Sequence, residues 1–259
     1  MSRIERTELA PGLELSRVLT GLWQVADIER HGDLLDPDDS AEEMARYVDA
    51  GFTTFDMADH YGTSELIAGR FATSRPNDAE LLTKWVPAPG PHTASDVREA
   101  VERALKRMAQ DSLDVLQFHA WSYPDPAWLD CMFFLKELQD EGLIRQIGLT
   151  NTDTAHVRML LDTGIGVVSN QVCYSLLDQR ARGDMTELCL ERGVGILAFG
   201  TLAGGFLTDR WLGKDEPELD KLETWSQMKY KRFIDAAGGW APFQELLGAI
   251  DRAARRLDV

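Results

Sequence analysis

Two patterns of hydrophobic and polar positions alternate along the chain. Short continuous apolar runs are typical of strands in a parallel sheet that is covered on both faces. Between them lie longer stretches in which apolar residues recur every three or four positions, as in amphipathic helices. Strands are predicted at residues 19–23, 53–58, 80–85, 113–118, 146–150, 167–174 and 195–199, and helices at 40–50, 65–73, 95–108, 128–141, 154–162, 185–192 and 243–257.

Capping residues set several of these boundaries. Ser40, with Glu43 three residues later, predicts the start of the first helix, and Gly51 predicts its end. Ser95 is expected to cap the third helix. By contrast, residues 208–231 form a long charged segment without a clear period, which indicates a loop.

Each predicted strand is followed by a helix, which fits either a doubly wound open sheet or a (β/α) barrel. A doubly wound nucleotide-binding sheet carries a G-x-G-x-x-G turn after its first strand. Here that strand runs into Leu22, Trp23 and Gln24 instead. The pattern therefore favours an α/β fold of the (β/α)8 TIM-barrel type, with about seven of the eight usual units present.

We expect residues 1–259 to form a single barrel domain. Residues 1–19 are expected to form an N-terminal cap, with a hairpin that turns at Pro11-Gly12. Residues 208–239 are expected to be a long loop after strand seven that folds over a cofactor or substrate.

Charge and cysteine content restrict the function classes. The chain has 27 basic and 43 acidic residues, a formal net charge of −16, which argues against nucleic acid or an anionic membrane as partners. No apolar run reaches the roughly 20 residues that a membrane helix needs, and the first residues do not resemble a signal peptide. Cys131, Cys173 and Cys189 have no metal-ligand spacing and indicate reduced thiols of a cytoplasmic protein.

Polar residues stand at the ends of three successive predicted strands. Asp56 lies in the second strand and Tyr61 follows it, Lys84 lies in the third, and His119 follows the fourth. Barrel enzymes gather their chemistry at this end. A nearby ammonium lowers the pKa of a tyrosine from its usual value of about 10.

We therefore expect Lys84 to tune Tyr61, Asp56 to hold Lys84, and His119 to orient a carbonyl oxygen. This set predicts a proton donor for carbonyl reduction by hydride transfer. Because no side chain delivers a hydride, a nicotinamide cofactor is implied. Each residue alone also fits a structural role, as an ion-pair partner, a packed aromatic or a buried histidine, and only the combination favours catalysis.

Six segments in order resemble motifs of the aldo-keto reductase family. They cover residues 51–62, which contain Asp56 and Tyr61, and residues 82–84, 113–119, 144–151, 170–177 and 196–205. Each motif alone is weak, whereas the ordered set is specific and extends over nearly the whole chain.

The resemblance implies an NAD(P)H-dependent reductase of small carbonyl compounds, with NADP favoured over NAD and no metal. It implies that Tyr61 is the general acid/base, that Lys84 and Asp56 tune it, and that His119 positions the carbonyl. The implied cofactor contacts are Gly21, Leu22, Trp23, Asp56, Asn151, Gln171, Phe199, Gly200, Thr201, Leu202 and Gly204. Trp23, Trp85 and Trp121 either line the substrate mouth or serve packing.

One departure from the family pattern concerns the C-terminal region. Family members continue with an eighth strand and helix whose basic residues bind the adenosine 2′-phosphate, whereas this chain ends at Val259. We expect the eighth unit to be missing and the exposed strand edges to favour a homo-oligomer. Arg252, Arg255 and Arg256 fit the last turn of a helix better than a substitute phosphate site.

Two alternatives to an active reductase stay open. One is a truncated or regulatory member of the family that binds the cofactor weakly and acts through a protein partner. The other is an isomerase or lyase on a similar barrel, which is disfavoured because the sequence shows no metal-ligand cluster or pair of catalytic carboxylates.

Overall fold

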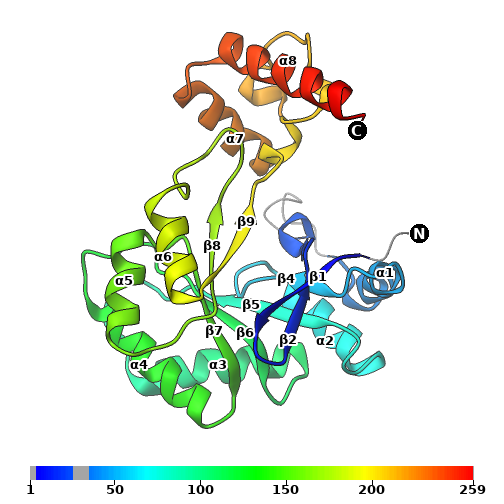
Figure 1. The fold of residues 1–259 in the computed structure, drawn as a ribbon. Coiled ribbons are helices and arrows are strands. Elements are labelled where there is room, and N and C mark those ends of the chain that lie inside the picture. Colours follow the sequence, from blue (N-terminus) through cyan, green and yellow to red (C-terminus); the bar gives the residue numbers. More distant parts are fainter. Residues whose placement is uncertain (1–3, 26–34, 259) are drawn as a thin grey trace. The chain divides into compact units, whose positions relative to one another are not determined.

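A seven-stranded sheet dominates the computed structural model, which describes residues 4–25 and 35–258 (Figure 1). Its strands follow the chain order β3-β4-β5-β6-β7-β8-β9, and the pairs from β3 to β8 are parallel. The strands are β3 (Thr20–Gly21), β4 (Thr54–Asp56), β5 (Glu80–Trp85), β6 (Leu113–Phe118), β7 (Ile144–Thr150), β8 (Ser169–Cys173) and β9 (Gly195–Phe199). This is a TIM-barrel-type α/β sheet with seven units, which confirms the predicted fold class.

Helices connect the strands, as the sequence pattern predicts. They are α1 (Pro37–Asp49), α2 (Ser64–Ser74), α3 (Ala94–Met108), α4 (Ala127–Asp140), α5 (Thr154–Asp162), α6 (Asp184–Arg192), α7 (Trp225–Ala236) and α8 (Trp240–Leu257). Helices α1 to α4 pack side by side in chain order, and α3 and α4 also contact strands β5 and β7 (Figure 1). Short 3-10 helices occur at η1 (Leu22–Val25), η2 (Ala203–Gly205), η3 (Asp209–Trp211) and η4 (Leu219–Lys221).

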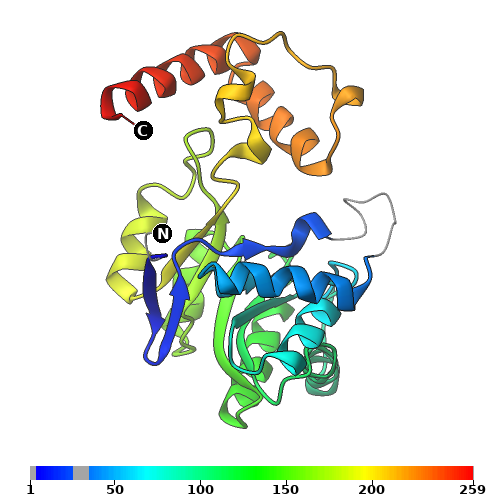
Figure 2. The ribbon, with the colours of Figure 1, turned by 90° about the vertical axis from the view of Figure 1, so that its right-hand side faces the viewer.

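The chain begins with the predicted hairpin, formed by antiparallel strands β1 (Arg6–Ala10) and β2 (Leu13–Ser16) (Figure 2, dark blue). Gly12 permits the turn because its φ of 76° is readily accessible to glycine. Leu13 and Leu15 pack with Leu82 and Val115, so the hairpin shares a hydrophobic core with β5 and β6. Residues 1–3 of the predicted cap and Val259 lie outside the described residues.

The chain folds into two compact units, residues 1–171 with 185–197 and residues 172–184 with 198–259. The core of the first unit contains fully buried side chains of the strands and of α2, such as Phe55, Phe71, Leu82 and Phe118. The second unit has its own core, formed by Cys173, Ala203, Phe206, Leu207, Tyr230, Ile234, Phe243 and Leu247. The expectation of a single domain stays a prediction.

Two predicted helix caps are wrong. Helix α1 begins at Pro37 because the Asp36 carboxylate accepts hydrogen bonds from two backbone amides of the first turn, so Ser40 lies inside the helix. Thr93, not Ser95, caps α3, and it forms a reciprocal capping box with Asp96.

The segment 208–239, predicted to be a loop, contains the 12-residue helix α7. Thr224 caps this helix, and Tyr230 and Ile234 on one face are buried in the second unit. Within the described residues, no helix is long and apolar enough to cross a membrane. The predicted thiols agree with the structure, in which Cys131, Cys173 and Cys189 are free and buried.

Candidate active site

A buried ion pair forms the centre of the candidate site in the first unit. The Lys84 ammonium, on β5, lies 2.6 Å from Asp56 Oδ2 at the end of β4. It also donates to the Met57 carbonyl oxygen at 2.9 Å. The side chains are only 2% and 13% exposed, and a lysine buried to this degree requires such partners.

Two glutamine side chains complete the surroundings of Asp56. Its Oδ1 accepts hydrogen bonds from Gln117 Nε2 at 2.7 Å and from Gln171 Nε2 at 2.9 Å. The Gln171 amide also donates to Gln117 Oε1 at 3.0 Å. The sequence prediction missed Gln117, although a polar residue within an apolar strand was a usable signal. The structure places Gln117 opposite Lys84 in the β5–β6 register.

Tyr61 lies beside this pair, with its ring centroid 5.2 Å from the Lys84 ammonium. The rings of Trp23 and His60 pack against it edge to face, each at a centroid distance of 4.8 Å. Burial is the largest cause that raises the pKa of Tyr61 well above its usual value, and the negative charges of Asp56 and Asp59 add to it. All three effects raise the pKa, and tuning of Tyr61 by Lys84 stays a prediction.

His119 follows β6 and is nearly buried. Its Nε2 lies 3.3 Å from the Asn151 amide nitrogen, and the Asn151 backbone N–H donates to the Gln171 carbonyl oxygen at 2.8 Å. Asn151 adopts a left-handed φ of 54°, a conformation that asparagine tolerates better than most residues. The structure thus brings His119, Asn151 and Gln171 together, and their roles toward a carbonyl and a cofactor stay a prediction.

The tryptophans assigned to the substrate mouth differ in exposure. Trp85 is 6% exposed and packs edge to face against Phe118 and His92, which favours the packing interpretation. Trp121 is 68% exposed, and its ring lies 4.9 Å from that of His119. Trp121 is therefore a better substrate-contact candidate than Trp85.

The first predicted cofactor contacts lie where β3 ends. Gly21, the last residue of β3, is in register with Asp56 on β4, and Leu22 and Trp23 follow directly after it. These three residues therefore lie at a strand end next to the ion pair. Leu22 is buried, whereas Trp23 is partly exposed.

The remaining cofactor candidates lie in the second unit. Phe199 ends β9, and Thr201 and Leu202 are exposed in the loop that follows. Gly200 and Gly204 both have positive φ and lie directly against Tyr230 of α7. Of the terminal arginines, Arg255 pairs with Asp251 at 2.9 Å within α8, as expected of a helical surface.

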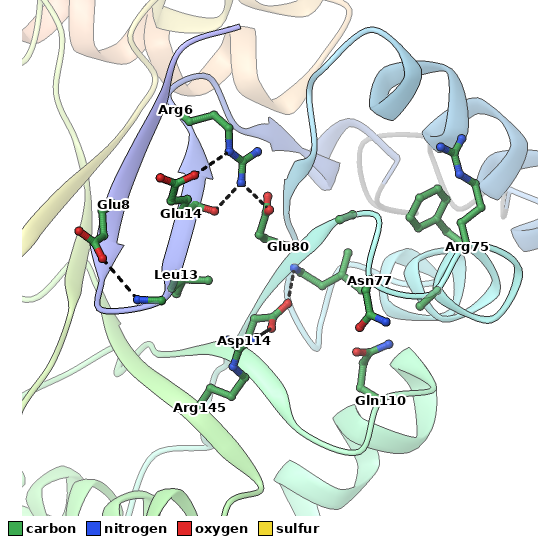
Figure 3. A pocket seen from close by; sticks show the side chains of 15 residues that line it. Arg6, Glu8, Leu13, Glu14, Arg75, Asn77, Glu80, Gln110, Asp114 and Arg145 are labelled. Carbon is green, nitrogen blue, oxygen red and sulfur yellow. Dashed lines mark hydrogen bonds and ion pairs between the residues drawn. The ribbon is translucent and has the colours of Figure 1, made fainter.

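A polar cavity of about 510 Å³ opens at the other end of the first unit's strands (Figure 3). Glu80, Asp114 and Arg145 on its wall belong to the amino ends of β5, β6 and β7. Arg6 pairs with Glu80 at 2.6 Å, and Arg145 pairs with Asp114 at 2.7 Å (Figure 3). The charges of these two pairs therefore neutralise one another. No cluster of three or more metal-ligating side chains occurs in the described part of the chain.

Comparisons with known proteins agree with this geometry. The model of the Aldo/keto reductase family matches residues 17–259. The 6-dehydroglucose reductase of Agrobacterium fabrum is 31% identical over 246 residues, 85% of this chain and 78% of that protein. The NADH-specific methylglyoxal reductase of Escherichia coli is 25% identical and aligns with 76% of this chain and 66% of that protein.

Among solved structures, the holo form of an aldo-keto reductase from Bacillus halodurans superposes with a TM-score of 0.70. It is 24% identical, and the match covers 89% of this chain and 76% of that one, which shows a common fold. Together, the family model, the relatives and the fold show that this chain belongs to the aldo/keto reductase family.

Proposed function

We propose that the protein is an NAD(P)H-dependent oxidoreductase that reduces a small aldehyde or ketone, or oxidises the corresponding alcohol. The observation that carries the proposal is the Lys84–Asp56 pair at 2.6 Å beside the ring of Tyr61. Family relatives that are named as reductases support the same reaction type.

In this proposal Tyr61 donates a proton to the carbonyl oxygen as that oxygen gains negative charge. Its raised pKa keeps the phenol protonated at neutral pH, as a donor must be. The Lys84 ammonium, held by Asp56, stabilises the phenolate that forms, and His119 orients the carbonyl. When bound, the nicotinamide cofactor supplies the hydride.

The side chains that would hold the cofactor fit a nicotinamide. Gln171 Oε1 accepts no hydrogen bond within the described residues, so it is available to the N–H of a carboxamide. Asn151, in the same unit, offers an amide. The family resemblance further implies that Phe199, in the second unit, offers an aromatic face for stacking. We propose NADPH as the preferred form. The relative named as NADH-specific makes a direct comparison of the two cofactors necessary.

The test is oxidation of NADPH and NADH by the purified chain, with methylglyoxal, a sugar aldehyde and simple aldehydes as substrates. Aldehyde-dependent loss of reduced-nicotinamide absorbance supports the proposal. Cofactor binding without turnover would favour the alternative of a regulatory family member. Absence of both binding and turnover would refute the reductase assignment. The cytoplasmic location and the homo-oligomer stay predictions.

A further inference from the structure

A lysine side chain lies over the aromatic ring at the end of β9. The Lys229 ammonium is 4.6 Å from the ring centroid of Phe199 and 5.2 Å from that of Tyr230. Both distances are in the range of cation–π contacts. All three residues belong to the second unit.

Close packing between α7 and the loop after β9 holds this arrangement. Tyr230, which follows Lys229 in α7, is buried against Gly200 and Gly204. A Cβ atom at Gly204 would lie 2.9 Å from the Tyr230 ring, and one at Gly200 would collide with the Tyr230 hydroxyl. The two glycines therefore let α7 approach the loop closely enough for Lys229 to reach Phe199.

The Lys229 ammonium is attracted by the Asp178 carboxylate but forms no ion pair with it. Within the described residues, no ion pair joins Lys229 to an acidic side chain, whereas Lys231 in the same helix pairs with both Glu216 and Asp235. The nearby Asp178 is engaged by Arg180 through two hydrogen bonds, at 2.9 and 2.6 Å. The Phe199 ring thus lies beside a positive charge that has no directly paired carboxylate within the described residues.

We propose that Lys229 makes the cofactor site discriminate between nicotinamide charge states, favouring the neutral reduced ring over the cationic oxidised ring. The inference rests on the proposed function, in which Phe199 stacks on the nicotinamide. A cationic ring on Phe199 competes with Lys229 for the same aromatic quadrupole and is repelled by its charge, whereas a neutral ring is not. Lys229 thereby promotes release of the oxidised cofactor.

The test measures dissociation constants of the full chain for reduced and oxidised cofactor by fluorescence titration and competition. NADPH with NADP⁺ and NADH with NAD⁺ serve as probes. The ratio of oxidised to reduced dissociation constants is expected to fall about threefold in Lys229→Met and Lys229→Gln, and to persist in Lys229→Arg, which keeps the charge. Lys221→Met is the matched control, because Lys221 is an exposed lysine of the same unit that pairs with Glu218.

A second measurement needs no variant. Raising the ionic strength is expected to lower the ratio in the unmodified chain, because salt screens an exposed charge. If Lys229→Met weakens the binding of both cofactor forms equally, the lysine acts on the cofactor's phosphates and the inference is overturned. Unchanged dissociation constants for both forms would overturn it as well. Binding of neither form by the unmodified chain would instead refute the proposed function itself.

Discussion

Replacing Asp56 by asparagine should destabilise the first unit strongly, because Lys84 would keep a buried charge without a counter-ion. Lys84 is 2% exposed and would retain the Met57 carbonyl oxygen as a charge-neutral partner. The introduced amide occupies nearly the same volume as the carboxylate, so a loss of packing contributes little.

The magnitude follows from the geometry of the pair. Breaking a buried ion pair from one side costs about 3–5 kcal/mol, and we expect about 3 kcal/mol for Asp56→Asn because one hydrogen bond to Lys84 survives. Lys84→Met should cost about 2 kcal/mol, since Asp56 retains the two glutamine donors at 2.7 and 2.9 Å. The double variant removes both charges and should cost about 2 kcal/mol, which gives a coupling energy of about 3 kcal/mol.

Urea unfolding followed by tryptophan fluorescence measures the free energy of unfolding of all four proteins. The exposed pair of Lys136 and Asp140 on α4 is the control, with an expected coupling below about 0.5 kcal/mol. Additivity of Asp56→Asn and Lys84→Met within about 0.5 kcal/mol would refute the argument that the pair is energetically coupled.

Three further predictions concern stability. Glu80→Ala should lower the free energy of unfolding by about 2 kcal/mol in urea, because Glu80 accepts hydrogen bonds from Arg6 of the hairpin and from Thr53 and Thr54; an unchanged midpoint would contradict this. Gly200→Ala should lower the unfolding midpoint and change the near-UV spectrum, because the new Cβ would collide with the Tyr230 hydroxyl and the backbone φ of 69° is unfavourable for alanine. An unfolding midpoint and a spectrum equal to those of the unmodified chain would show that the loop adapts. Burial raises the pKa of Glu65, so the folded chain binds more protons than the unfolded chain and stability falls as pH rises from the usual glutamate pKa to the raised one. Glu65→Gln should flatten that dependence, measured by unfolding at several pH values, and an unaltered slope would count against it.

The sequence predicted the sheet well because each strand is a short apolar run bounded by polar residues. The bounds of β5, β6, β9 and α5 agree with the prediction at both ends. Helix starts were less predictable, since Asp36 and Ser40 are both good capping residues. Only the structure shows that Pro37 begins the helix.

Helix α7 was missed because its buried residues include Lys231 beside Tyr230 and Ile234, so that apolar and charged residues do not separate along its sequence. The division into two units was not apparent either, since no linker composition marks it.

The candidate site was predictable as far as residue identity, but not in its electrostatics. Strand order and parallel pairing correctly brought Asp56 and Lys84 together. The sequence could not show that burial would raise the pKa of Tyr61, nor that Gln117 would share the Asp56 carboxylate with Gln171. Both depend on side-chain depth and rotamer.

The most direct test of the proposed chemistry is the Tyr61→Phe variant, which removes one hydroxyl and preserves the ring that packs against Trp23. Turnover and the dissociation constant of the reduced cofactor should be measured on the same preparation. We predict a loss of aldehyde reduction by at least about a hundredfold, with cofactor affinity within about twofold of the unmodified chain. Aldehyde reduction at the unmodified rate in Tyr61→Phe would contradict the assignment of Tyr61 as proton donor.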